Sequence, residues 1–382
     1  MRFNSTYTLT TGDDGMITDR FALRLGITML AGIAGGAAFQ AAGLPLPWVL
    51  GAAMAAMVLN GARKEWLLWP RLLSDAGAIV VAYLLGSTIT PATALRMAAD
   101  LPGMVAAASL WVAVCIAGGL LFARLARLSE TDAVLGCVPG GLTQMVLVAA
   151  DTKGADPGTV ALLQTSRLVV VLYTVPFLAA VFADPAVQAA ASAPAAAAPP
   201  AEVVPQPGGL AGWGLLLLMP LAAWAARRLR VPAGEFLGPV LAAGAFAIAG
   251  LHGPAVPGFG LGAARLCMGL YVGSRIQPLV FWRNKRLGPL ALLAAGGMVL
   301  LTVAAAWALS RLGGSSAVTW FLSLAPGGLG EMAVTALLLG ADVPQVTAYQ
   351  MFRLLFVLLA APPVLRLVLS RRGATRDGRA GL

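Results

Sequence analysis

Charged and metal-binding side chains are scarce in this chain of 382 residues. Asp, Glu, Lys and Arg make up 11% of the sequence, whereas a soluble domain carries them at roughly a quarter of its positions. The single histidine, His252, and the three scattered cysteines cannot supply the clustered ligands that copper, iron or structural zinc requires. We therefore expect no soluble globule, no cofactor, no metal and no enzymatic activity.

Long apolar runs are what the sequence has in place of charge. Hydrophobic residues account for 59% of the chain, and runs of about 20 such residues recur, which is the length a helix needs to cross a bilayer. The net charge of +10 does not indicate nucleic acid, because the basic residues cluster at the ends of the apolar runs. The pattern predicts an all-α polytopic protein of a bacterial-type plasma (inner) membrane, with the lipid bilayer and not nucleic acid as its partner.

The second half of the chain repeats the first. A shift of 187 positions superimposes residues 45–145 on the second half, and beyond Met145 and Met332 the shift becomes 186. A duplication inside a membrane chain is typical of transporter-like folds built from two related halves. The matched pairs include Pro45 and Pro232, Gly51 and Gly238, Pro91 and Pro278, Arg124 and Arg311, Asp156 and Asp342, Gln164 and Gln350, and Arg167 and Arg353.

The repeat also gives the domain organisation. Residues 1–20 form a cytoplasmic N-terminal segment, 21–182 the first membrane repeat, and 210–369 the second. The Ala/Pro-rich stretch 183–209 is expected to be a flexible or polyproline-like linker, and 370–382 a basic cytoplasmic tail. Each repeat reads as six apolar segments, at 21–40, 46–60, 72–89, 103–123, 131–150 and 157–182, and at 210–226, 233–250, 262–278, 288–310, 317–339 and 344–369.

The fifth apolar segment of each half contains Pro-Gly-Gly, at 139–141 and at 326–328. Proline removes a helix hydrogen bond and glycine lowers helix propensity, so we predict that the helix breaks there. If this segment enters and leaves on one side, each half crosses an odd number of times. Nearly all basic loops and both termini then lie in the cytoplasm, as the positive-inside bias favours. A broken fifth helix that spans, with another segment failing to cross, would keep the same odd count.

The loop charges also predict the orientation of the two halves. Arg63-Lys64 in one half lies opposite the neutral Gly250-Leu251 in the other. Related halves with exchanged loop charge are expected to lie upside down relative to each other. The predicted fold therefore has about ten transmembrane helices plus two Pro-Gly-Gly-broken or re-entrant segments, arranged as two inverted-topology repeats.

The two breaks are the first candidate site. Non-helical backbone at membrane depth must line a cavity or be buried in protein, and the positive ends of broken helices attract anions. A plain turn between two short helices is the alternative. The candidate substrate-binding residues at the breaks are Pro139, Gly140, Gly141 and Thr143 in the first half, with Pro326, Gly327 and Gly328 in the second.

Gln144 and Glu331 occupy matching positions, three residues beyond the second glycine of each break. A carboxylate inside an apolar segment is costly unless it is paired or hydrated, and it marks a pathway by default. Glu331 could take up a proton, or it could be the fixed partner of an arginine. The sequence leaves both roles open.

Arg167 and Arg353 are the sharpest signals in the chain. Asp156 and Asp342 read as helix N-caps, so each arginine lies about 11 residues, or roughly 16 Å, into its helix. That depth is near the bilayer midplane, too far from a helix end for the side chain to reach water easily. Each arginine could recognise an anion, or it could be satisfied by backbone carbonyls and hold the broken helices in place.

Neighbouring residues bear on that choice. Gln164 and Gln350 precede the two arginines by three residues and share their helix face. Two midplane arginines against Glu331 leave an excess of positive charge, which favours a small anion such as a carboxylate. The balance would change if Asp132 or Asp151 reached the cavity.

The stretches from Pro139 to Arg167 and from Pro326 to Arg353 resemble the AbrB-type duplicated membrane protein family, and the likeness covers about residues 25–370. That family has carried the label "ammonia monooxygenase" and a label for control of gene expression. The resemblance implies kinship with the cation-proton antiporter and anion transporter fold, in which two broken helices cross at the midplane. The enzyme label finds no support in a chain with one histidine.

These observations predict a secondary transporter or exporter of a small anionic solute, with a proton or cation as the coupling ion and a homo-oligomer as an assembly left open. The competing hypothesis is a membrane-embedded sensor or regulator that binds a ligand without moving it and affects gene expression indirectly. An enzyme subunit is a distant third.

Overall fold

The computed structural model describes most of the chain, with gaps at both ends and between the two halves. The described residues are 14–140, 142–152, 154–183, 209–229, 231, 233–251, 253–278, 281, 284–357 and 359. Within these ranges the regular structure is helical and contains no strand, which confirms the predicted all-α class. Apart from its two end residues, the predicted linker lies outside the described residues, as does the predicted basic tail.

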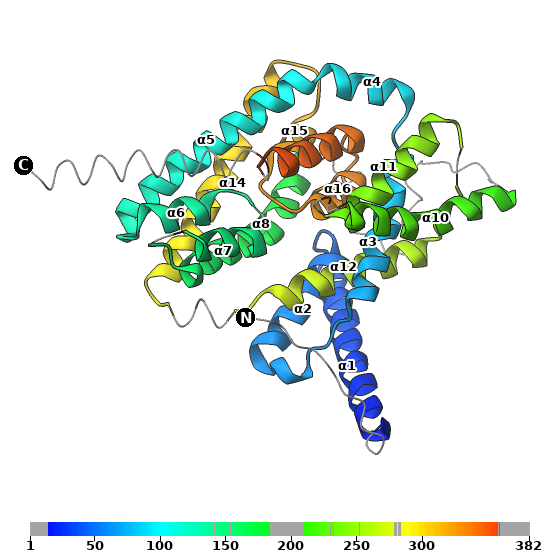
Figure 1. Ribbon diagram of the computed structural model, residues 1–382, viewed down its shortest axis with the longest axis horizontal. Helices are drawn as coiled ribbons and strands as arrows, with labels where there is room; N and C mark the ends of the chain where they lie inside the picture. The colour runs from blue at the N-terminus through cyan, green and yellow to red at the C-terminus, as the bar shows by residue number, and fades with distance from the viewer. Residues whose placement is uncertain are drawn as a thin grey trace, which may run out of the picture.

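Two groups of helices build the molecule, and each group draws on both repeats (Figure 1). The first bundle contains α1 (Asp14–Ala41), α2 (Pro47–Ala62), the 3-10 helix η1 (Lys64–Trp66), α3 (Arg71–Ser87), α10 (Gly209–Arg228), α11 (Gly234–Ile248) and α12 (Gly258–Arg275). The second bundle contains α5 (Leu101–Ala126), α6 (Glu130–Cys137), α7 (Leu142–Ala150), α8 (Pro157–Phe182), α14 (Leu287–Arg311), α15 (Ala317–Leu324), α16 (Leu329–Leu338) and a helical stretch over 343–357. The short α4 (Pro91–Ala99) connects α3 to α5.

The local backbone follows the repeat seen in the sequence. Leu46 and Ala233, which the 187-residue shift superimposes, both adopt a left-handed conformation, with φ of 48° and 49°, directly before α2 and α11. Such a conformation is unfavourable for a residue with a Cβ atom. Its recurrence at matched positions shows that the same tight entry into the helix is built into both halves.

Helices of opposite repeats pack closely in the first bundle, where α2 lies against α12 and α3 against α11. Small residues permit the approach. A Cβ atom added to Gly77 would lie 2.9 Å from the carbonyl oxygen of Ala264, and one added to Gly273 would collide with the backbone of Ala53. Asn60 fixes the same contact by donating hydrogen bonds to the carbonyls of Ser274, at 3.0 Å, and Ile276, at 2.8 Å. The first bundle is therefore a joint product of both repeats, held by backbone proximity as membrane bundles often are.

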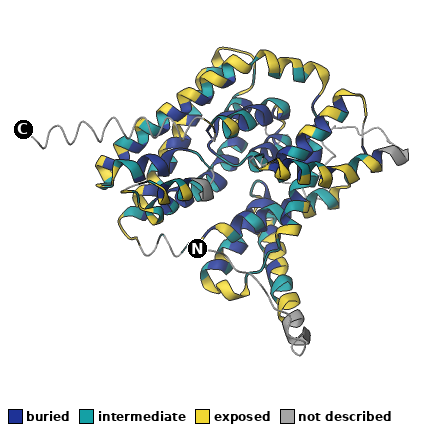
Figure 2. Ribbon diagram, viewed as in Figure 1, coloured by how far each residue is buried: buried dark blue, intermediate teal, exposed yellow. Residues whose placement is uncertain are grey.

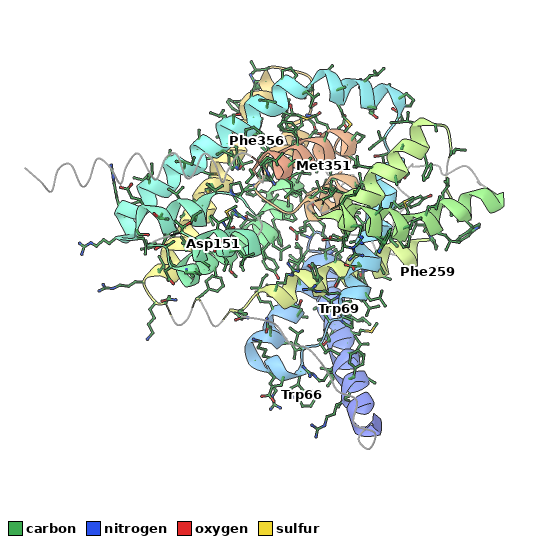
Figure 3. All side chains as sticks on the ribbon, in the orientation of Figure 1. Trp66, Trp69, Asp151, Phe259, Met351 and Phe356 are labelled. Atoms are coloured by element: carbon green, nitrogen blue, oxygen red, sulfur yellow. The ribbon has the colours of Figure 1, made fainter. Side chains whose placement is uncertain are left out.

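Many positions on the outward faces of the helices are exposed (Figure 2), and large apolar side chains occupy many of them. Leu217 is 78% exposed, Leu300 is 64% exposed, and Phe259, labelled in Figure 3, is 79% exposed. A soluble monomer rarely exposes contiguous apolar patches of this kind, whereas a lipid-facing helix requires them. Several apolar helices of the described chain thus have the surface of a membrane protein.

Four described helices are long and apolar enough to cross a membrane: α1 from Arg20, α5, α8 and α14. A fifth span results if α3 and α4 are counted together, although the pair is bent by 90°. The prediction of about ten spans is not confirmed. Part of the reason lies in the helices α2, α11 and α16, which are apolar but only 10–17 residues long.

Candidate functional site

Both fifth segments are broken where Pro-Gly-Gly occurs. In the first half α6 ends at Cys137 and α7 begins at Leu142, and in the second α15 ends at Leu324 and α16 begins at Leu329. A tight turn follows each first helix, because the N–H of Gly140 donates to the carbonyl of Val138 and the matched bond recurs in the second half, both at 2.8 Å. The predicted interruption of the helix is therefore confirmed in each repeat.

Each break is flanked by the same capping arrangement. Ser129 accepts a hydrogen bond from the N–H of Asp132 at the start of α6, and Asp132 Oδ1 accepts one of 2.7 Å from the N–H of Asp156. Asp156 in turn caps α8, where its carboxylate accepts from the N–H groups of Gly158 and Thr159. In the second half Ser316, Thr319 and Asp342 make the corresponding bonds.

Neither acidic residue that could have offset the charge of Arg167 and Arg353 forms an ion pair with them. The carboxylate of Asp132 accepts a hydrogen bond from the N–H of Asp156, the residue just before α8. Asp151 is exposed beyond the end of α7 (Figure 3). The positive charge of the two arginines is therefore not balanced by either group.

Arg353 and Gln350 lie against the C-terminal end of α15. The Arg353 guanidinium donates to the carbonyls of Leu324, at 3.3 Å, of Ala325, and of Gly327, at 2.8 Å. It also donates to Gln350 Oε1 at 2.5 Å. The Gln350 amide donates to the carbonyls of Leu322, Ser323 and Ala325, over 2.6, 3.4 and 3.1 Å.

Arg167 and Gln164 repeat this arrangement on α6. The Arg167 guanidinium donates to the carbonyls of Val138, at 3.1 Å, and Gly140, at 3.2 Å. The Gln164 amide donates to the carbonyls of Leu135, at 2.8 Å, and Val138, at 2.9 Å. The last carbonyls of a helix lack partners within it and carry the negative end of its dipole, so a cation stabilises them.

The sequence left two roles open for the arginines. The structure shows one of them, since both guanidiniums donate hydrogen bonds to backbone carbonyls. The charges themselves are not paired with carboxylates, because the one ion pair among the described residues joins Arg227 and Asp75 at 2.6 Å. The two guanidiniums lie close enough for their like charges to interact. Two positive charges from different repeats therefore lie in one region of the second bundle.

Glu331 lies in the first turn of α16, where its carboxylate accepts a hydrogen bond of 3.2 Å from the N–H of Gly328. It forms no ion pair with an arginine in the part of the chain that the structure describes. Of its two possible roles, the fixed partner of an arginine is therefore not seen, and proton uptake is not tested.

The remaining candidate residues divide into three kinds. Pro139 is half-buried and Pro326 is buried, each at the turn of its break. Gly141 lies outside the described residues, and the side chains of Thr143 and Gln144 are not described either. The two breaks can therefore be compared through their turns, caps, arginines and glutamines, but not through the side chains of Thr143 and Gln144.

Sequence analysis missed three residues close to Arg353. Trp111, Ser323 and Tyr349 line a small crevice together with Arg353. Tyr349 directly precedes Gln350 and lies four residues before Arg353, so the helix spacing could have placed it on the arginine's face. Trp111 comes from the distant α5, and no sequence signal connects it to the break.

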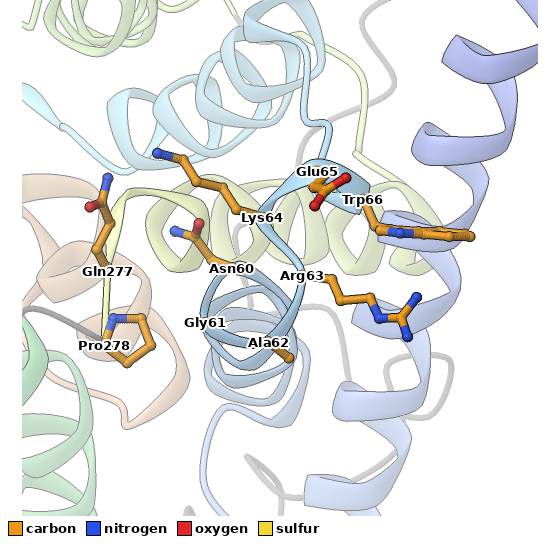
Figure 4. A pocket seen from close by; sticks show the side chains of 9 residues that line it. All are labelled: Asn60, Gly61, Ala62, Arg63, Lys64, Glu65, Trp66, Gln277 and Pro278. Atoms are coloured by element: carbon orange, nitrogen blue, oxygen red, sulfur yellow. The ribbon is translucent and has the colours of Figure 1, made fainter. Parts of the chain in front are cut away.

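A larger pocket lies elsewhere, where the C-terminal end of α2 meets the C-terminal end of α12 (Figure 4). Its volume is about 500 Å³, and its wall includes Asn60, Lys64 and Gln277. The charged side chains at its rim are exposed, and Arg63 lies over the ring of Trp66 at 5.9 Å from the centroid. None of the residues predicted from the breaks lines this pocket.

Comparison with known proteins places the chain in a family. Residues 48–369 match the model of the AbrB family, described as "Transition state regulatory protein AbrB", and the chain therefore belongs to that family. The chain is 28% identical over 375 residues to "Uncharacterized protein YhjN" of Bacillus subtilis (strain 168), covering 91% of this chain and 94% of that protein. It is 26% identical over 333 residues to "Putative regulator AbrB" of Escherichia coli (strain K12), covering 86% and 92% respectively. These matches confirm the resemblance drawn from the two repeated stretches.

Proposed function

We propose that this protein is a secondary transporter of a small anionic solute, with its substrate site where the two broken segments of the second bundle meet. The observation that carries the proposal is the matched placement of Arg167 and Arg353 on the carbonyl ends of α6 and α15. Their hydrogen bonds to neutral carbonyls fix the guanidiniums without cancelling their charge. A region with two uncompensated cations favours an anion.

The helix ends at the breaks support the same choice of solute. The N-terminus of α16 presents N–H groups and the positive end of a helix dipole next to Gly328. Broken helices in secondary transporters use such N-termini to hold anionic groups. The carboxylate of Glu331 lies at this N-terminus. Protonation of Glu331 would free the N-terminus of α16 to bind the solute, and would couple proton movement to solute movement.

The topology belongs to the same proposal. The two repeats lie inverted across the bacterial-type inner membrane, with about ten crossings and both termini in the cytoplasm. The support is the exchange of loop charge between the repeats, together with the packing of α2 on α12 and of α3 on α11. Short helices such as α2 and α11 then cross with the help of flanking residues or by local thinning of the bilayer.

A second candidate function is a membrane-embedded sensor that affects gene expression indirectly. The description of the matching family model and the name given to the Escherichia coli relative favour it, since both contain a regulatory term. A sensor would use the same site and would bind the same class of ligand. The two functions differ only in whether the bound solute crosses the membrane.

Two measurements on purified full-length protein test the transporter proposal. A thermal-shift screen against acetate, succinate, citrate, phosphate and ammonium comes first, and we expect stabilisation by at least one carboxylate and none by ammonium. Uptake of the stabilising anion into proteoliposomes follows. We expect flux that Arg353→Ala abolishes and that Arg124→Ala, which removes an exposed arginine at the end of α5, leaves intact.

The outcomes separate the candidates. Stabilisation by a carboxylate without flux would contradict the transporter proposal and favour the sensor. No stabilisation by any anion would contradict the proposed class of solute for both.

A further inference from the structure

We propose that the crevice beside Arg353 is a subsite for a hydrogen-bond-accepting oxygen of the solute, a carboxylate or carbonyl, and that the solute enters it past Tyr349 from a vestibule at the start of α5. This inference rests on the proposed transport function and assigns that function an entry route. It concerns one end of the molecule only, because the matched end is closed by apolar side chains.

The crevice lies between α5, α15 and the helical stretch 343–357. Its wall includes Ala108, Trp111, Ser323, Tyr349 and Arg353, and its volume is about 10 Å³. A space of that size holds roughly one water molecule. It can therefore receive a single functional group of a solute, and a whole solute only if the neighbouring side chains move.

Two buried polar groups in the wall have no hydrogen-bond partner among the residues that the structure describes. They are the hydroxyl of Ser323, whose residue is 2% exposed, and the indole N–H of Trp111, whose residue is 7% exposed. Buried polar groups are nearly always satisfied, so each exception requires an explanation. The indole can only donate and the hydroxyl can donate. These two unpartnered donors beside the positive charge of Arg353 match an acceptor oxygen of the solute.

The crevice adjoins a vestibule of about 280 Å³, because Met104 and Tyr349 line both spaces. The Tyr349 hydroxyl donates a hydrogen bond of 2.6 Å to Asp100 Oδ2, and the Tyr349 ring contacts Trp320 edge-to-face at 5.5 Å between centroids. These contacts hold the tyrosine ring between the two spaces. Movement of Tyr349 and of the flexible Met104 would join them.

The vestibule does not itself select an anion, because two carboxylates, Asp100 and Asp342, line it against one arginine. Asp100 accepts a hydrogen bond from Tyr349, and Asp342 accepts one of 3.0 Å from the N–H of Gln345, but neither bond removes the negative charge. Arg96 lines it as well and is exposed. Selection for an anion is therefore assigned to the crevice, where Arg353 has no acidic neighbour in the wall.

Apart from the arginine, the matched positions of the other repeat lack the polar side chains of the crevice. The repeat places Leu163 where Tyr349 stands, Leu287 where Asp100 stands, and Ala291 where Met104 stands, and these three belong to one apolar cluster. Gly136 replaces Ser323, and Met298 replaces Trp111. The polar route past Tyr349 therefore has no counterpart at the matched positions, which apolar side chains occupy.

A matched pair of cysteines tests the proposal. Leu324 lines the crevice, and the repeat superimposes it on the native Cys137, with each residue 9% exposed. One variant carries Leu324→Cys with Cys115, Cys137 and Cys267 replaced by alanine, and its control keeps Cys137 and replaces only the other two. The full-length proteins are treated with an anionic reagent, sulfonatoethyl methanethiosulfonate, or a cationic one, trimethylammonioethyl methanethiosulfonate. Labelling is followed by mass spectrometry.

We expect the introduced cysteine to react with the anionic reagent faster than with the cationic one by about tenfold or more, and Cys137 to react slowly with both. Acetate, as the smallest carboxylate probe, should slow this labelling. Trp111→Phe or Ser323→Ala should remove the protection by acetate. Trp69→Phe, which deletes an indole N–H equally buried and unpartnered but distant from the crevice, should keep it.

Equal labelling of the two positions, preference for the cationic reagent, or no protection by acetate would overturn the subsite. If Leu324→Cys does not yield folded protein, Ser323→Cys takes its place with the same expectations. Selective labelling that acetate slows, without flux in proteoliposomes, would support the subsite and contradict the transport function. Flux without selective labelling would remove the subsite alone.

Discussion

The Arg353 guanidinium donates a hydrogen bond of 2.8 Å to the carbonyl oxygen of Gly327, and thereby ties the helical stretch 343–357 to the break between α15 and α16. Arg167 makes the matched bond to Gly140, at 3.2 Å. The two bonds stabilise non-helical backbone that lipid could not satisfy, because hydrocarbon offers no hydrogen-bond donors. The same side chains thus fix the breaks and supply the positive charge that the proposed solute requires.

The contribution of these bonds to stability can be measured on the second repeat. Arg353→Ala leaves the carbonyl of Gly327 without its side-chain donor and removes one of the donors to Ala325, so we expect a loss of about 1–3 kcal/mol in the free energy of unfolding. Arg353→Lys keeps the charge and fewer donors, and its loss should be smaller. Thermal unfolding in detergent measures both, with the exposed Arg124→Ala as the control. An Arg353→Ala protein as stable as the parent would contradict the structural role.

The amide of Gln350, on the same helix face as Arg353, should also be required for stability. Gln350→Glu replaces a group that donates to three carbonyls by one that only accepts, so we expect about 2–3 kcal/mol of destabilisation at neutral pH. Gln345→Glu is the matched control, since Gln345 accepts from the Ser315 hydroxyl, and a carboxylate accepts as well. The two variants are compared by thermal unfolding. Equal stability of the two would show that the amide donors of Gln350 are not needed.

Close packing between the repeats predicts a large difference between two glycines. Gly273→Ala would place a Cβ atom against the backbone of Ala53, which cannot shift as a side-chain tip can, so we expect a loss of about 1–3 kcal/mol. Gly118→Ala in α5 meets nothing within 4 Å, and alanine favours helix over glycine by about 1 kcal/mol. The purified yield and the unfolding temperature should therefore fall for Gly273→Ala and not for Gly118→Ala. A tolerated alanine at Gly273 would mean that α2 and α12 lie farther apart than described.

The Asp156 cap predicts a pH-dependent contribution to stability. Hydrogen bonds from the side chain and N–H of Thr159 and from the N–H of Gly158 hold the pKa of this carboxyl below its usual value. A lowered folded-state pKa means that the cap stabilises fully above the unfolded pKa, about 3.9, and that this stability is lost as pH falls through the folded pKa. Asp156→Ala should therefore cost about 1 kcal/mol at pH 7 and progressively less at acidic pH.

The matched control for that experiment is Ser129→Ala. Ser129 caps α6 through a hydroxyl that does not titrate, so its loss should cost a similar amount at every pH. Thermal unfolding of both variants and the parent across the acidic range gives the comparison. A cost for Asp156→Ala that does not change with pH would contradict the ionised cap.

Local features were predicted well from the sequence because their causes lie within a few residues. Pro-Gly-Gly breaks a helix wherever it occurs, and an acidic residue followed by proline caps one, as at Asp156 before Pro157. The three-residue spacing places Gln350 beside Arg353, and the bond between them confirms their shared face. The number of membrane crossings was predicted less well, because apolar length alone does not say which short helices span.

The sequence by itself determined the duplication, the positions of the breaks and the spacing of each glutamine and arginine, since all three depend on neighbours along the chain. The sequence did not determine what the arginines bind. Only the tertiary structure shows that they bind the carbonyls at the ends of α6 and α15. The tertiary structure alone also brought Tyr349 to Asp100, which lie 249 residues apart, and Trp111 to Ser323. Contacts of that kind depend on how helices of two repeats pack against one another, and packing partners leave no periodic signal in a single sequence.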